Sequence, residues 1–144
     1  LGADPELREK IAGEVVIYPV TDHYDAGFPS YVERAKGQTL TADLMRWFWD
    51  TYLAGGKPGG SDEARAFPAR SSALGTLPST FLVTAEYDPL RDEGIAFSEQ
   101  LREAGVALEQ RRFGNAAHGF ACSEGPNEDF EAMIVDLLAW LEKL

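Results

Sequence analysis

The feature that most constrains this chain is an apolar run over residues 80–85, TFLVTA, which has the length of one strand. A strand without polar–apolar alternation is typical of the interior of a parallel sheet, where helices cover both faces. Parallel strands also need crossover connections, which are usually helices. Residues 80–85 therefore predict an α/β fold in which this strand has neighbours on both sides.

The segments around this run predict the other parts of such a fold. Residues 14–18 are β-branched and aromatic and predict a second buried strand. A helix is expected over residues 92–104 with its stop at Gly105, and residues 106–113 alternate in polarity, as in a strand nearer a sheet edge. Strand, helix and strand in this order imply a right-handed βαβ crossover.

Two amphipathic helices are expected outside this unit. Thr41 is a good N-cap for one that ends at Gly55-Gly56, and Asn127 is a good N-cap for the last. The apolar face of the first consists of Leu44, Met45, Phe48, Trp49, Tyr52 and Leu53. The expected buried positions of the last are Phe130, Met133, Ile134, Leu137, Leu138 and Leu141. Residues 19–38 and 55–79 are rich in Gly, Pro and polar residues and predict irregular connections.

Composition excludes several functional classes. The 144 residues include 13 basic and 24 acidic side chains, so the net charge of −11 argues against nucleic acid or an anionic membrane as a partner. The single cysteine, Cys122, excludes an internal disulfide framework and a multi-cysteine zinc site. No apolar run has the length of a membrane span. One cysteine and an N-terminus unlike a signal peptide favour the cytoplasm.

Two polar residues follow the predicted strands at the carboxyl ends, where ligands bind in open α/β sheets. Asp88 follows the strand at 80–85, and His118 follows the strand at 106–113. If these strands are neighbours, both side chains emerge at one edge of the sheet, where the carboxylate orients the imidazole. Such a pair would form the acid and base of a Ser-His-Asp triad. The residues leave one alternative open, a capping Asp beside Pro89 and a surface His.

Two other residues, His23 and Cys122, are weaker candidates for a functional role. His23 lies between Asp22 and Asp25, but only one imidazole is available there and the spacing suits no helix face, so a solvated loop is expected rather than a metal site. Cys122 lies four residues after His118 and is expected to be a small buried or loop thiol rather than a nucleophile.

The nucleophile of a triad is missing from the sequence. No Gly-x-Ser-x-Gly occurs, and no His-Gly-Gly stretch is present that could supply oxyanion-hole amides. The chain therefore has an orienting acid and a base without a serine motif.

Several motifs resemble the C-terminal half of the hormone-sensitive-lipase-like esterases, which are α/β-hydrolases. The motifs are YPVTD at 18–22, TAEYDPLRDEG at 84–94, LREAGV at 101–106 and HGF at 118–120. Leu40-Thr41, Met45-x-Trp47-Phe48, Tyr52-Leu53 and Leu77-Pro78-x-Thr80 also match, so that the resemblance spans nearly the whole chain.

The resemblance implies a function and assigns residues to it. Asp88 matches the triad acid and His118 the general base of these esterases. Trp47, Phe48 and Phe120 match substrate-binding positions, with Trp47 and Phe48 on a helix that helps to cover the pockets. Such enzymes hydrolyse short- to medium-chain carboxylic esters without a metal or organic cofactor.

The resemblance also implies that residues 1–144 are the C-terminal part of one α/β-hydrolase domain, a mostly parallel sheet flanked by helices with part of the cap helix. The N-terminal portion would supply the serine and the oxyanion hole, so this chain alone is expected to be inactive. Many relatives dimerise through an edge strand, and the strand at 106–113 is compatible with a homodimer. The alternatives are a non-catalytic small-ligand receptor, like the gibberellin receptors, and an inactive fragment. The presence of both Asp88 and His118 favours the enzyme.

Overall fold

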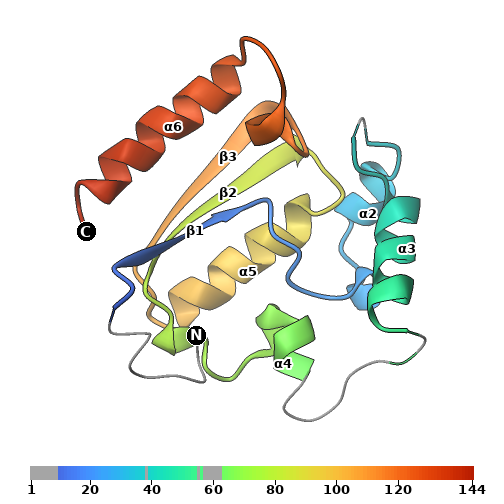
Figure 1. Cartoon of the computed structure of the whole chain (residues 1–144). Coiled ribbons are helices and arrows are strands. Elements are labelled where there is room, and N and C mark those ends of the chain that lie inside the picture. Colours follow the sequence, from blue (N-terminus) through green and yellow to red (C-terminus); the bar gives the residue numbers. More distant parts are fainter. Residues whose placement is uncertain (1–9, 38, 55, 57–62) are drawn as a thin grey trace.

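A computed structural model describes residues 10–37, 39–54, 56 and 63–144. Its centre is a parallel sheet of three strands, β1 (Gly13–Ile17), β2 (Ser79–Tyr87) and β3 (Leu108–Ala117), in the order β1-β2-β3 (Figure 1). The predicted α/β class is confirmed, and the apolar strand at 80–85 forms the middle of the sheet. Burial on both faces explains why residues 80–85 include no charged side chain.

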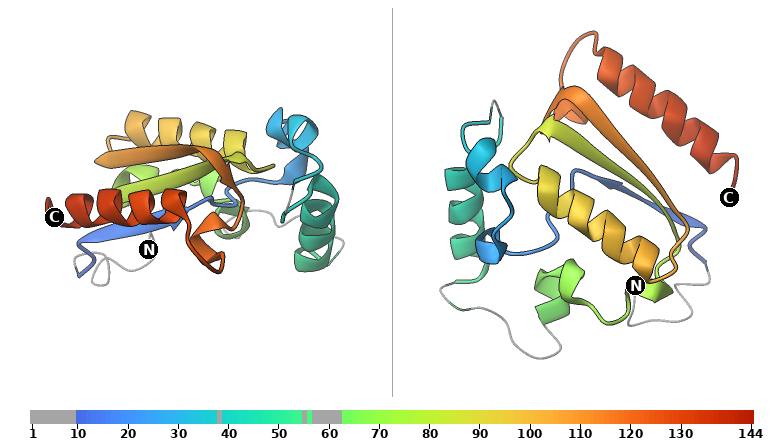
Figure 2. Two further views of the ribbon diagram at one scale, coloured as in Figure 1. Left: turned by 90° about the horizontal axis from the view of Figure 1, so that it is seen from above. Right: turned by 180° about the vertical axis from the view of Figure 1, so that it is seen from behind.

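Helices α5 (Arg91–Glu103) and α6 (Glu128–Leu141) cover opposite faces of the sheet (Figure 2). Alternate side chains of β2 meet them: Phe81 and Val83 lie in the core on the α6 side, whereas Leu82 packs with Phe97 of α5. Helix α5 matches its predicted bounds within one residue at each end. Its first turn approaches β2 so closely that a Cβ on Gly94 would lie 2.9 Å from Cγ2 of Thr84.

Helix α6 begins as predicted, because the Asn127 side chain accepts a hydrogen bond of 3.1 Å from the backbone N–H of Phe130. The predicted burial of Phe130, Leu138 and Leu141 is wrong, because all three side chains are exposed. The helix meets the sheet through one stripe made of Met133, Ile134, Leu137 and Trp140. Trp140 was not predicted to be buried, yet its ring packs 5.6 Å from the ring of Phe81.

A smaller cluster lies beside the sheet around α3 (Ala42–Tyr52), which has the predicted N-cap: the Thr41 hydroxyl accepts 3.1 Å from the N–H of Leu44. Its buried members include Trp49, Phe67 and Leu90. The helix ends at Tyr52, and Gly55, half of its predicted stop, lies outside the described residues.

The connections predicted to be irregular contain short helical turns. These are η1 (Tyr24–Ala26), α2 (Ser30–Glu33), α4 (Glu63–Ala66), η3 (Pro68–Arg70) and η4 (Leu74–Thr76). No helix in the described part of the chain is long and apolar enough to cross a membrane.

Two strands differ from the prediction. β3 continues past residue 113 to Ala117, because its pairing with β2 resumes at Tyr87 after an irregularity. β1 is only half-buried, and Val15 is 42% exposed. β1 is an end strand of the described sheet, so its outer edge has no strand beside it there.

Glu93, in the first turn of α5, forms hydrogen bonds with the segment between β1 and α3. Its fully buried carboxylate accepts 2.8 Å hydrogen bonds from the N–H of Thr21 and from the hydroxyl of Tyr31. Burial outweighs these hydrogen bonds and raises the pKa of Glu93 to about 7. One buried side chain therefore fixes the position of α2 and of the chain that follows β1.

Trp140→Ala should lower the free energy of unfolding by about 3–5 kcal/mol, because it removes a large buried ring and leaves a cavity against Phe81. Leu138→Ala, at a position that is 56% exposed on the same helix, should cost less than about 1 kcal/mol. Urea unfolding followed by circular dichroism measures both. Equal losses would contradict the narrow contact stripe of α6.

Glu93 should make stability depend on pH. Its pKa rises from an ordinary 4.5 to about 7 on folding, so the unfolded state ionises first as the pH rises, and stability falls by up to about 3 kcal/mol across this window. In Glu93→Gln this fall should disappear from urea unfolding curves measured between pH 4.5 and 8. Glu99→Gln, at an exposed position of α5, should keep the wild-type pH dependence. A Glu93→Gln curve parallel to that of the wild type would refute the argument.

Candidate active site

Asp88 and His118 meet at the carboxyl edge of the sheet. Tyr87 of β2 pairs with Ala117 of β3, and Asp88 and His118 are the next residue on each strand. Because the strands are parallel, the two side chains lie at the same edge of the sheet. Nδ1 of His118 lies 2.8 Å from Oδ2 of Asp88. The structure thus brings together the two residues that the sequence proposed as acid and base.

Hydrogen bonds hold both oxygens of the Asp88 carboxylate. Asp88 is fully buried, and its second oxygen, Oδ1, accepts 2.8 Å from the N–H of Leu90. A carboxylate can only accept, so Nδ1 of His118 carries the proton of the shared hydrogen bond. Nε2 then has a lone pair, and no hydrogen bond joins it to another described residue. The His118 side chain is 24% exposed, which leaves it accessible.

Three further contacts hold His118, and the sequence predicted none of them. Its N–H donates 3.4 Å to the carbonyl of Tyr87, and its own carbonyl accepts a hydrogen bond from the hydroxyl of Thr39. The ring of Tyr18 lies 4.5 Å from the imidazole, tilted by 55°. Thr39 and Tyr18 are far from His118 in the sequence, and only the tertiary fold places them there.

An ion-pair network surrounds the end of β2, just before Asp88. Glu86 accepts from Arg34 at 2.8 Å and from Arg91 at 3.1 Å through Oε1, and from Arg112 through Oε2. Hydrogen bonds from Arg112 and Arg34 lower the pKa of Glu86 to about 2. The network joins α2, α5 and β3 at this point and keeps the strand end in place.

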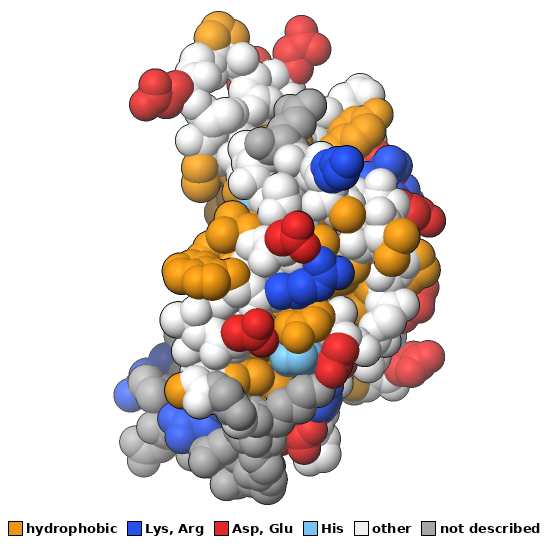
Figure 3. Space-filling view, turned by 90° about the vertical axis from the view of Figure 1, so that its right-hand side faces the viewer, with side chains coloured by type: hydrophobic (Ala, Val, Ile, Leu, Met, Phe, Trp, Pro, Cys, Tyr) orange, Lys and Arg blue, Asp and Glu red, His pale blue; other side chains and the backbone are white. Residues whose placement is uncertain are grey.

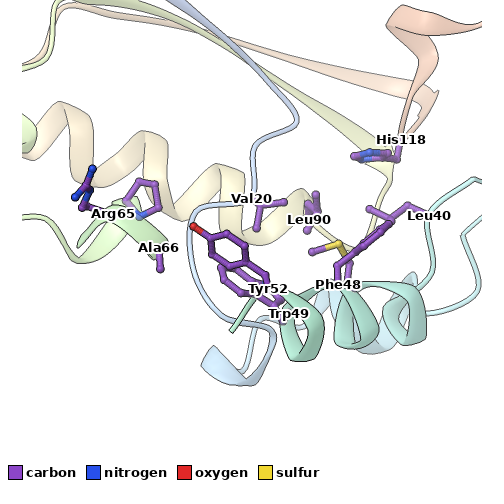
Figure 4. A pocket seen from close by; sticks show the side chains of 11 residues that line it. Val20, Leu40, Phe48, Trp49, Tyr52, Arg65, Ala66, Leu90 and His118 are labelled. Atoms are coloured by element: carbon purple, nitrogen blue, oxygen red, sulfur yellow. The ribbon is translucent and has the colours of Figure 1, made fainter. Parts of the chain in front are cut away.

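A pocket of about 530 Å³ opens beside the pair, with His118 in its wall (Figure 4). His118 and Arg65 lie towards opposite ends, and apolar side chains separate them (Figure 4). The remaining lining residues are Val20, Leu40, Met45, Phe48, Trp49, Tyr52, Ala66, Pro68 and Leu90. The arrangement presents an imidazole with a free lone pair to an apolar space.

The three residues predicted to bind substrate have different positions. Phe48 lines the pocket. Trp47 does not: it is 59% exposed and packs against the ring of Phe48 at 5.3 Å, because it points away from the contact face of α3. Phe120 also lies outside the wall, because it is buried 5.2 Å from the ring of Phe113 in the core under α6. On the side of the molecule that carries α2 and α3, hydrophobic patches alternate with charged side chains (Figure 3).

His23 does not lie in a solvated loop, so that prediction is wrong. It is 4% exposed, packs against the rings of Tyr24, Trp49 and Phe67, and has Nδ1 2.6 Å from Asp25. Among the residues that the structure describes, no cluster of His, Cys, Asp and Glu could hold a metal ion. Cys122 is an exposed free thiol.

Comparisons with known proteins identify the family. A model of the α/β hydrolase fold matches residues 2–122. The chain is 32% identical to ethyl acetate hydrolase of Pseudomonas putida over 107 residues, which are 74% of this chain and 33% of that protein. It is 34% identical to the carboxylic ester hydrolase LipN of Mycobacterium tuberculosis over 105 residues, 73% of this chain and 27% of that protein.

Solved structures agree. Carboxyl esterase 2 from the fungus Tuber melanosporum aligns with a TM-score of 0.76 and 31% identity, covering 85% of this chain and 40% of that one. The chain spans less than half the length of the curated relatives that it matches. The resemblance to the hormone-sensitive-lipase-like esterases is thereby confirmed, and the chain belongs to the α/β hydrolase fold family.

Proposed function

We propose that this chain supplies the acid and the base of a serine carboxylesterase. The observation that carries the proposal is the hydrogen bond between buried Asp88 and His118 beside an apolar pocket. Relatives named as ester hydrolases support the same class of reaction. A ligand receptor does not need an imidazole held by a buried carboxylate, so the pair favours the esterase over a receptor.

The geometry supports a definite role for each residue. Nε2 of His118 takes the proton from a serine hydroxyl as that oxygen attacks the ester carbonyl, and it then gives the proton to the departing alcohol. The same nitrogen activates water for the second half of the reaction, in which the acyl group is released. Asp88 holds Nδ1–H and stabilises the imidazolium that forms in each step.

The nucleophile comes from outside this chain in our proposal. The sequence has no Gly-x-Ser-x-Gly, and no serine among the described residues forms a hydrogen bond with His118. An N-terminal portion of the same enzyme, on the same or a separate chain, would supply the serine and the oxyanion hole. The chain alone is then inactive.

The pocket favours esters with apolar acyl groups of short to medium length. Met45, Phe48 and Trp49 present apolar surface, and the volume of about 530 Å³ is that of a site for a small ligand. Between His118 and Arg65, a charged acyl chain would lose its hydration against these apolar side chains.

Asp88→Asn and His118→Ala should each lower kcat for a short-chain aryl ester by about 1,000-fold or more, because both break the proton relay. The assay uses the enzyme that contains this chain together with its N-terminal portion. Asp136→Asn removes a 2.9 Å ion pair with Arg111 on the surface of α6 and should leave kcat within about twofold. Full activity in the Asp88 or His118 variant would refute the assignment.

Labelling with a fluorophosphonate, followed by intact-mass and peptide analysis, tests the position of the nucleophile. The label should attach to a serine outside residues 1–144 and should require His118. A label on any serine of this chain, or on Cys122, would contradict the proposal.

A further inference from the structure

The backbone of Tyr18 adopts a left-handed conformation at a position where none is expected. Among the described residues, Tyr18 (φ +38°) and Ala54 (φ +47°) are the non-glycine residues with positive φ. Ala54 follows the C-cap of α3, where this conformation is common. Tyr18 instead follows the last residue of β1, and a left-handed aromatic residue costs about 1–3 kcal/mol. Strain of this kind persists only where the surroundings enforce it.

The contacts of Tyr18 show what enforces its left-handed conformation. Its N–H donates 2.7 Å to the carbonyl of Val83, which continues the β1–β2 pairing. Its ring lies 4.5 Å from the imidazole of His118 and 5.9 Å from the ring of Phe120. The strained turn therefore leaves the sheet pairing intact and places an aromatic ring against His118.

The hydroxyl of Tyr18 contributes little. It contacts the thiol of Cys122, 3.9 Å away, which is a weak hydrogen-bond partner, and it forms a hydrogen bond with the backbone of Ala121; neither partner is His118. Burial and this thiol raise the pKa of Tyr18 to about 12, so the hydroxyl remains protonated when an esterase works near neutral pH. The ring, rather than the hydroxyl, is the part that acts on His118.

We infer that Tyr18 is a positioning residue, whose ring fixes the plane of the His118 imidazole and shields its Nδ1–H···Asp88 hydrogen bond from water. A single hydrogen bond at Nδ1 lets the imidazole tilt about it, and tilting moves Nε2, the atom that must meet the serine. Contact with an aromatic ring removes this freedom. The inference rests on the proposed function for its effect on the reaction, but the contact itself can be tested without activity.

The kinetic test compares variants of Tyr18 in the enzyme that contains this chain and its N-terminal portion. Tyr18→Leu should lower kcat about 10- to 100-fold with KM within about twofold, because a misplaced base slows proton transfer without altering the pocket. Tyr18→Phe keeps the ring and should retain kcat within about twofold. Ala54→Gly, at the other positive φ, and Cys122→Ala should both behave as wild type. If Tyr18→Phe loses as much activity as Tyr18→Leu, the hydroxyl matters and the inference is wrong.

A spectroscopic test separates this inference from the proposed function. In 15N-labelled enzyme, the Nδ1 proton of His118 should give a low-field signal that disappears in His118→Ala. Its exchange with water should become at least several-fold faster in Tyr18→Leu, and also in Tyr18→Met if the leucine variant unfolds, but not in Tyr18→Phe. Unchanged exchange in the folded leucine or methionine variant would overturn the positioning role, even if Asp88 and His118 prove to be catalytic. Faster exchange would support the positioning role of Tyr18 even if Asp88 and His118 prove not to be catalytic.

Discussion

The pairing of β2 with β3 is the constraint on which the site depends. Side chains alternate between the two faces of a strand, so a register shift of one residue would turn Phe81 and Val83 from the α6 side to the α5 side, where Leu82 packs with Phe97. Burial of these residues thus fixes the register, and the register places Tyr87 opposite Ala117. Asp88 and His118 meet because they are the next residues on each strand. The hydrophobic core therefore determines the distance between two polar groups that lie outside it.

Strong and local signals made much of the fold predictable. The apolar run of β2, the stop of α5 at Gly105 and the caps Thr41 and Asn127 act within a few residues, and each has its expected place. The juxtaposition of Asp88 and His118 followed from the same reasoning, because the ends of neighbouring parallel strands must meet. The sequence does not show which of the many apolar residues of α6 face the sheet, so Leu138 and Leu141 are exposed against expectation and Trp140 is buried.

The environments of residues near the site share one cause as well. Side chains distant in the sequence surround His23, Phe120 and Tyr18, and no local pattern predicts such contacts. The polar residues next to His23 in the sequence predicted exposure to solvent, but aromatic rings of α3 and of residue 67 pack against it. The left-handed turn at Tyr18 has no signature in the residue types, since glycine or asparagine is usual there.

Helix α3 both attaches to the rest of the molecule and forms part of the pocket wall. Met45 and Trp49 are buried and also line the pocket, whereas Phe48 and Tyr52 line it from largely exposed positions. A change at Phe48 or Tyr52 alters the shape of the pocket without removing a buried side chain, so its cost in folding free energy is small. The pocket wall can therefore vary at two exposed positions of this helix while its buried residues keep the helix attached.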